Sequence, residues 1–141
     1  MIGRVKIVLD TNILVSALIT KGTPPDLLYQ AWSVGDFGLV TSDRQFDELT
    51  RVLAYEKLQR YIKPQAASVL LANMQEMAEM VTGLRKVDYS PDPDDNWIIA
   101  TALQGGADYI VSGDKRDMIS ITSVEDIKIM TANDAIDILL P

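Results

Sequence analysis

The chain contains neither cysteine nor histidine among its 141 residues. Without cysteine there are no disulfides, no thiolate nucleophile and no zinc–thiolate site, and this composition fits a reducing cytoplasmic location. Without histidine there is no Ser-His-Asp triad, no histidine general base and no imidazole-ligated transition metal. If the protein is an enzyme, its chemistry must come from carboxylates, hydroxyls, amides, lysine, arginine or a hard metal ion such as Mg²⁺ or Mn²⁺.

Basic residues and long apolar runs are also scarce. Thirteen basic residues against twenty acidic ones give a net charge of -7, which argues against a broad basic face that holds nucleic acid. An acidic cleft neutralised by bound cations is still compatible with this charge, and solubility alone also explains it. No apolar run reaches the roughly 18 residues of a membrane span, and the first residues lack the features of a signal peptide. We therefore expect a cytoplasmic protein that does not associate with membranes.

What is present is a regular alternation of short apolar runs with segments of helical periodicity. Apart from Lys6, the run at residues 5–9 is apolar on both faces, as in a parallel sheet covered by helices, and it ends on Asp10 in the stretch VKIVLDTNILVSAL. The pattern predicts strands at residues 5–9, 37–41, 84–87, 108–112 and 127–130. It predicts helices at residues 11–19, 24–34, 64–81 and 132–140, after Ser42, and over WIIATALQ. A single α/β domain spanning residues 1–141 follows, a three-layer α/β/α sandwich with a central parallel five-stranded sheet.

Local signals predict how several helices begin and end. Ser42 followed three residues later by Gln45 is typical of a capping box, and Thr131 is expected to cap the last helix. The pair Gly105-Gly106 is expected to end the helix over WIIATALQ. Apolar residues on two of the helices are expected to lie in the core: Met74, Met77, Met80 and Trp97.

Four acidic residues fall where the carboxyl ends of the predicted strands meet. Asp10 ends the first strand and Asp114 follows the fourth, while Asp95 opens the helix over WIIATALQ and Glu48 borders the apolar stripe of its helix. In parallel α/β sheets this edge is where ligands bind. Two carboxylates 4 Å apart repel by about 4 kcal/mol at an effective dielectric constant near 20, and a divalent cation removes that cost. Such an ion can also polarise a phosphoryl oxygen.

Each acid, taken alone, has a simpler explanation. Asp10 could cap the helix that follows it, and Glu48 could be a solvated helix residue. Asp94 and Asp95 could both be helix caps, and Asp114 could be a turn residue after glycine. The hypothesis of a shared site depends on all four falling on one edge of one sheet.

Three stretches of the chain resemble PIN-domain ribonucleases, in particular the toxin components of bacterial and archaeal type II toxin–antitoxin pairs: VLDTNILVSAL, TSDRQFDELTRVL and DPDDNWIIATALQGGADYIVSGD. The resemblance implies the same α/β/α fold and an endoribonuclease that depends on Mg²⁺ or Mn²⁺. It places the family's four acids on Asp10, Glu48, Asp95 and Asp114. Ser112 stands where the family usually has threonine.

The resemblance also implies supporting groups and partners. Thr11, Asn12 and Ser112 would orient the carboxylates, and Asp117 would be a further metal ligand through outer-sphere contact. Because Asp92, Asp94 and Asp95 crowd one turn, which of them is the third ligand stays open. A small antitoxin that blocks the cleft and a homodimer are implied as well, and four basic residues near the acids are expected to contact phosphates of an RNA substrate: Arg44, Arg51, Lys115 and Arg116.

Other readings of the same residues are weaker. A haloacid-dehalogenase-like phosphatase would need aspartate two positions after Asp10, where this chain has Asn12, and a response-regulator receiver would need an acidic pair at the first strand. A PIN-like module that binds RNA or protein without cutting, and a PIN nuclease that processes RNA outside a toxin–antitoxin pair, stay open as alternatives.

Overall fold

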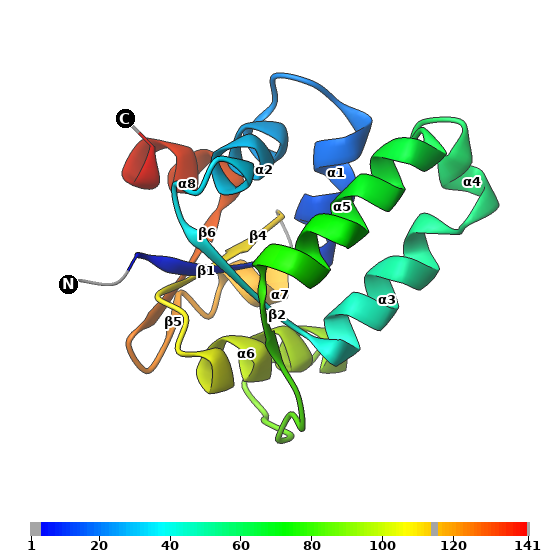
Figure 1. The fold of residues 1–141 in the computed structure, drawn as a ribbon. Helices are drawn as coiled ribbons and strands as arrows, with labels where there is room; N and C mark the ends of the chain where they lie inside the picture. The colour runs from blue at the N-terminus through cyan, green and yellow to red at the C-terminus, as the bar shows by residue number, and fades with distance from the viewer. Residues whose placement is uncertain (1–3, 114–115, 141) are drawn as a thin grey trace.

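A single sheet organises the computed structural model, which describes residues 4–113 and 116–140. Six strands within these ranges pair in the spatial order β3-β2-β1-β4-β6-β5 (Figure 1). All neighbours pair in parallel except β5, which is antiparallel to β6. In chain order the strands are β1 (Lys6–Leu9), β2 (Gly38–Ser42), β3 (Glu79–Val81), β4 (Tyr109–Ser112), β5 (Ser123–Val124) and β6 (Ile127–Thr131).

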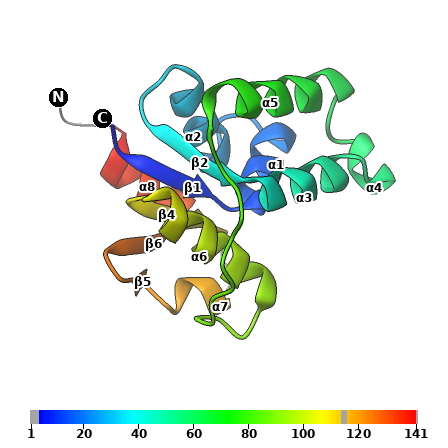
Figure 2. The same cartoon turned by 60° about the horizontal axis from the view of Figure 1, so that its bottom comes forward.

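Helices cover both faces of the sheet, as Figure 2 shows. Alternate strand residues enter two separate cores: Ile7 and Leu9 of β1 pack on one side, and Val8 packs on the other. The first core is closed by α1 (Thr11–Ile19), α2 (Pro24–Ser33), α3 (Asp43–Leu53), α5 (Pro64–Met77) and α8 (Ala132–Leu139). The second core is closed by α6 (Pro93–Gly105) and α7 (Arg116–Ile119), while the short α4 (Glu56–Gln59) joins α3 to α5. The predicted three-layer α/β/α fold is confirmed.

The predicted helix boundaries are confirmed where a side chain or a glycine sets them. The Ser42 hydroxyl accepts a hydrogen bond from the backbone N–H of Gln45, and the Thr131 hydroxyl accepts one from Asp134. Gly106 adopts a left-handed conformation (φ 65°) that ends α6. The helices are consequently short, and none in the described ranges is long and apolar enough to cross a membrane.

One predicted strand and the end of one predicted helix are wrong, and the sheet has one strand more than expected. Residues 84–87 form no strand, and the helix predicted for residues 64–81 ends at Met77. The last residues of that segment form β3, which pairs with β2 at the edge of the sheet. Because a short apolar segment fits either periodicity, the free edge of β2 decides its conformation. The two-residue β5 precedes β6 and pairs with it in an antiparallel hairpin. It is too short to give a sequence pattern from which a strand could be predicted.

The expectation that all three methionines lie in the core is correct for one of them. Met74 is fully buried under the sheet, whereas Met77 is 46% exposed and Met80 is 38% exposed. Met77 is the last residue of α5, and Met80 lies in β3, the strand at the edge of the sheet.

Candidate active site at the carboxyl end of the sheet

Asp10 lies where the central strand β1 ends and α1 begins. Its carboxylate is 3% exposed and makes no capping bond to the helix, although the residue occupies the N-cap position. Its backbone N–H donates to the Val111 carbonyl (2.9 Å), and the Ser112 hydroxyl donates to Asp10 Oδ2 (3.0 Å). The neighbouring strand β4 therefore orients the Asp10 carboxylate, and Ser112 has the supporting contact expected of it.

The three acids at the start of α6 have three different environments. Asp92 is the N-cap, and its side chain accepts a hydrogen bond from the Asp94 backbone N–H (2.9 Å). Asp94 is exposed to solvent. Asp95 is 1% exposed, and its Oδ2 accepts a hydrogen bond from the Ser90 hydroxyl (3.0 Å). Asp95 is thus the buried one of the three acids, and the loop before α6 supplies a hydroxyl donor to it.

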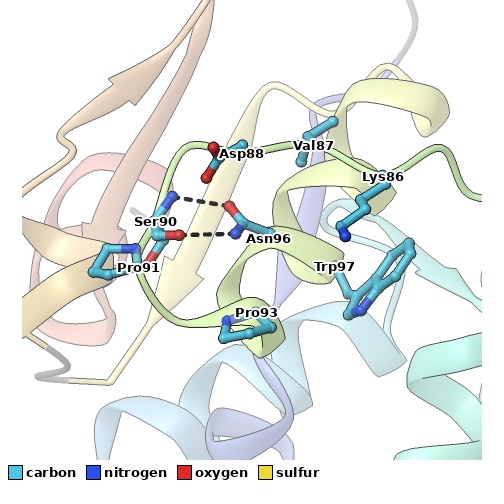
Figure 3. A pocket seen from close by; sticks show the side chains of 8 residues that line it. All are labelled: Lys86, Val87, Asp88, Ser90, Pro91, Pro93, Asn96 and Trp97. Atoms are coloured by element: carbon cyan, nitrogen blue, oxygen red, sulfur yellow. Dashed lines mark hydrogen bonds between the residues drawn. The ribbon is translucent and has the colours of Figure 1, made fainter.

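A tight loop before α6 places the Ser90 hydroxyl against Asp95. Asn96 Oδ1 accepts a hydrogen bond from the backbone N–H of Ser90 (2.9 Å), and its Nδ2 donates to the Ser90 carbonyl (2.8 Å) (Figure 3). Asn96 Oδ1 also accepts from the backbone N–H of Tyr89 (2.8 Å). The Ser90 hydroxyl also accepts from the Asp92 backbone N–H (3.1 Å). Sequence reasoning missed Ser90 and Asn96, although the SPDPDDN segment is a recognisable turn next to the acid.

Gln45 connects α3 to the end of β1, close to Asp10. Its Nε2 donates to the Leu9 carbonyl (2.7 Å), and its Oε1 accepts from the Thr41 hydroxyl (2.7 Å). The Gln45 side chain thus bonds to both β1 and β2, and its backbone N–H donates to the Ser42 hydroxyl. Glu48 is partly buried and lies three residues further along α3. Residues three apart share a helix face, so Glu48 lies on the side of α3 that Gln45 fixes against β1.

The two polar residues after Asp10 differ in their surroundings. Thr11 is buried, and its hydroxyl lies 3.5 Å from Gln45 Nε2 as an acceptor. Asn12 is exposed. Both were expected to orient Asp10, whereas the hydroxyl that donates to Asp10 Oδ2 belongs to Ser112 on β4.

Arg44 and Trp97 form a contact between α3 and α6 beside the acids. The Arg44 guanidinium carbon lies 4.1 Å from the centre of the Trp97 ring. Trp97 is partly exposed and lines a cavity of about 550 Å³ with Lys86, Pro93 and Asn96 (Figure 3). The expectation that Trp97 belongs to the core is therefore wrong. Ile98 and Ile99 lie on the buried face of α6, and Trp97 lies at the edge of that face.

The remaining predicted site residues that the structure describes lie near the end of α3 and at the start of α7. Arg51 is exposed near the end of α3, and Arg116 and Asp117 are exposed in the first turn of α7, the segment that follows β4. Asp114 and Lys115 lie outside the described residues.

The donor set fits a hard divalent cation in its chemistry. Carboxylate and hydroxyl oxygens are the ligands that Mg²⁺ prefers, and that ion commonly takes one or two carboxylates with water and substrate phosphate. Within residues 4–113 and 116–140, no three acidic side chains are grouped closely enough to hold a metal ion. At this edge the described part of the chain provides Asp10 and Asp95 as buried carboxylates, while Asp114, two residues after Ser112 in the sequence, lies outside the described residues.

Comparison with known proteins gives one family. A family model described as PIN domain matches residues 6–116, which is most of the chain and includes all the elements that carry Asp10, Glu48 and Asp95. A comparison with curated proteins gave no match.

Proposed function

Because the chain belongs to the PIN-domain family, whose members are generally nucleases, we propose that it is a metal-dependent endoribonuclease that hydrolyses RNA phosphodiester bonds. The observation that carries the proposal is the pair of buried carboxylates, Asp10 and Asp95. Each is held by a serine hydroxyl where β1 ends or α6 begins. Burying two acids has no stabilising purpose by itself, whereas a cation shared with a substrate phosphate gives them one.

In this proposal the metal ligands are Asp10, Glu48, Asp95 and Asp114, with Asp117 in outer-sphere contact. A bound Mg²⁺ or Mn²⁺ would neutralise these carboxylates and polarise the scissile phosphate. Ser112 and Ser90 fix the directions of two of the acids, so the site loses little conformational freedom when it is filled. Gln45 keeps α3, and with it Glu48, in place beside β1.

The nucleophile in this proposal is water. The chain has no histidine to act as the acid–base pair that activates the RNA 2′-hydroxyl, and carboxylates are the groups available to accept the proton of water. Hydrolysis of this kind leaves a 5′-phosphate and a 3′-hydroxyl.

The test is cleavage of an end-labelled RNA pool in Mg²⁺ or Mn²⁺, with EDTA and with Asp10→Asn as negative arms. Asp137→Asn is the matched control, because it removes an exposed carboxylate of α8, far along the chain from the site. We expect the control to cut like the wild type, and Asp10→Asn to fall to the level seen in EDTA. Cleavage that persists in EDTA, or products with cyclic phosphate ends, would contradict the proposal.

The finer part of the proposal concerns biological role. The resemblance of the three quoted stretches supports a toxin of a toxin–antitoxin pair, with a small antitoxin and a homodimer as its partners in the cytoplasm. An antitoxin that inserts an arginine among the carboxylates would inhibit by pairing with them. Growth arrest on expression of the wild type but not of Asp10→Asn is expected; normal growth with active enzyme would favour RNA processing instead.

A further inference from the structure

One segment reverses the charge balance of this acidic chain. Residues 51–63 (RVLAYEKLQRYIK) contain four basic residues and a single acid, Glu56, and leave nine basic and nineteen acidic residues for the rest of the chain. Two tyrosines alternate with the basic residues. We call this set the basic–aromatic corner: Arg51, Tyr55, Lys57, Arg60, Tyr61 and Lys63.

The corner is a fixed structure, built around α4 at the tip of the α3–α5 pair (Figures 1 and 2). Its inner side is apolar: Ile62 is 4% exposed, and Leu58 packs against the first core. The backbone N–H groups of Tyr61 and Ile62 both donate to the Leu58 carbonyl (2.9 and 3.0 Å). With the inner residues anchored, the rings of Tyr55 and Tyr61 are left 41% and 59% exposed.

The positive charges of the corner are available to a ligand. In the described part of the chain the salt bridge joins Lys6 to Glu79, and none of the four basic residues of the corner forms a salt bridge there. The Lys57 ammonium lies 5.9 Å from the centre of the Tyr55 ring. A surface hollow of about 870 Å³ lies among Tyr55, Glu56, Lys57, Leu58, Arg60 and Tyr61.

Helix α3 joins the corner to the candidate active site. Its first turn carries Gln45, which is bonded to the Leu9 carbonyl next to Asp10, and its last residue, Leu53, leads into the corner. Eight residues at 1.5 Å each separate the two ends by about 12 Å. Glu48 and Arg51 lie between them on the same helix. A single strand whose binding site spans about four nucleotides or more covers such a distance.

We propose that the basic–aromatic corner binds single-stranded RNA that flanks the scissile phosphate. Lysine and arginine side chains contact the phosphates, and the exposed tyrosine rings stack with bases, the combination by which proteins hold single strands without reading their sequence. The corner would thus give an acidic protein a local attraction for a polyanion, away from the carboxylates that repel it. This inference rests on the proposed ribonuclease function for the identity of the ligand.

The test measures binding of a fluorescein-labelled 12-nucleotide RNA of mixed sequence by anisotropy, with Asp10→Asn as the background so that RNA is not cut. Lys57→Gln with Arg60→Gln removes two corner charges, and Lys21→Gln with Lys128→Gln removes two exposed charges elsewhere as the matched control. We expect the corner pair to reduce the slope of log K against log salt by about 1.4, at about 0.7 for each charge. The control pair should leave the slope unchanged.

The tyrosine arm separates stacking from charge. Tyr61→Ala is expected to weaken binding roughly tenfold without changing the salt slope, and Tyr61→Phe should restore affinity because only the ring is needed. Unchanged affinity in the corner variants, or an equal loss in the control pair, would overturn the proposal. So would a glutamate-rich peptide that binds as tightly as the RNA, since the partner would then be a protein. RNA that binds through the corner but is never cut by the wild type would reject the proposed function and leave only the binding of single-stranded RNA by the corner standing.

Discussion

At the scale of single residues, two buried carboxylates define the site, and a hydroxyl holds each of them. Asp10 and Asp95 are 3% and 1% exposed, and each accepts a hydrogen bond of 3.0 Å from a serine that belongs to another segment. A hydroxyl donor fixes the direction of a carboxylate without supplying a competing charge. The two serines therefore position the carboxylates that we propose as metal ligands.

Replacing Ser112 by alanine tests this positioning role. The variant removes the donor to Asp10 Oδ2. We expect kcat to fall about tenfold with little change in KM, because losing a group that hydrogen-bonds to a metal ligand typically costs about tenfold or more in activity. Ser112→Thr keeps the hydroxyl and should restore most of the rate. Steady-state kinetics on one RNA substrate, with thermal melting to confirm folding, checks both variants. Equal rates for the alanine and threonine variants would mean that the hydroxyl has no such role.

The sequence predicted which acids are candidates for the site better than it predicted which of them are buried. The stretch VLDTN predicts a carboxylate at the end of a buried strand, and Asp10 lies where β1 ends. That the acid is itself buried comes from the structure. Sequence alone could not choose among Asp92, Asp94 and Asp95, because aspartate is favourable at every position of a first helical turn. Which of the three acids is buried depends on the Ser90 hydroxyl and on the conformation of the loop that Asn96 closes, and helix preferences do not specify that conformation.

At the scale of elements, the site depends on how closely α3 and α6 approach the sheet. Gln45 joins α3 to β1, and the Thr101 hydroxyl on α6 donates to the Ser42 hydroxyl at the end of β2 (3.0 Å). Gly105 lets the end of α6 lie directly on β2, since a Cβ at that position would be 2.3 Å from Val40 Cγ1. A buried strand valine cannot move away easily, so the approach needs a residue without a side chain.

Gly105→Ala is expected to lower the free energy of unfolding by about 1–3 kcal/mol, the cost of overpacking a core, despite the better helix propensity of alanine. Gly38→Ala is the control, because its added Cβ would meet nothing closer than 3.8 Å. Urea denaturation should show a loss for the first variant and none of comparable size for the second. Equal stability of Gly105→Ala and the wild type would contradict the close packing described here.

At the scale of the whole molecule, the proposed metal site and the proposed RNA-binding corner lie in different parts of the chain. The whole chain has a net charge of -7, whereas residues 51–63 carry a local excess of basic side chains. The layered fold itself was predictable because the central strands are apolar on both faces, as at Ile7, Val8 and Leu9, which indicates a parallel sheet covered by helices on both sides. The edge strands were not, because β3 and β5 owe their conformation to the neighbours they pair with.

The most direct test of the central claim compares two adjacent acids of α6. In Mg²⁺, Asp95→Asn should lose RNA cleavage down to the level seen in EDTA, because its carboxylate is buried beside Ser90 and is proposed to hold the metal. Asp94→Asn, which changes an exposed carboxylate one residue away, should cut at close to the wild-type rate. A folded Asp95→Asn protein that cuts as fast as Asp94→Asn would show that this buried acid is not part of the catalytic site.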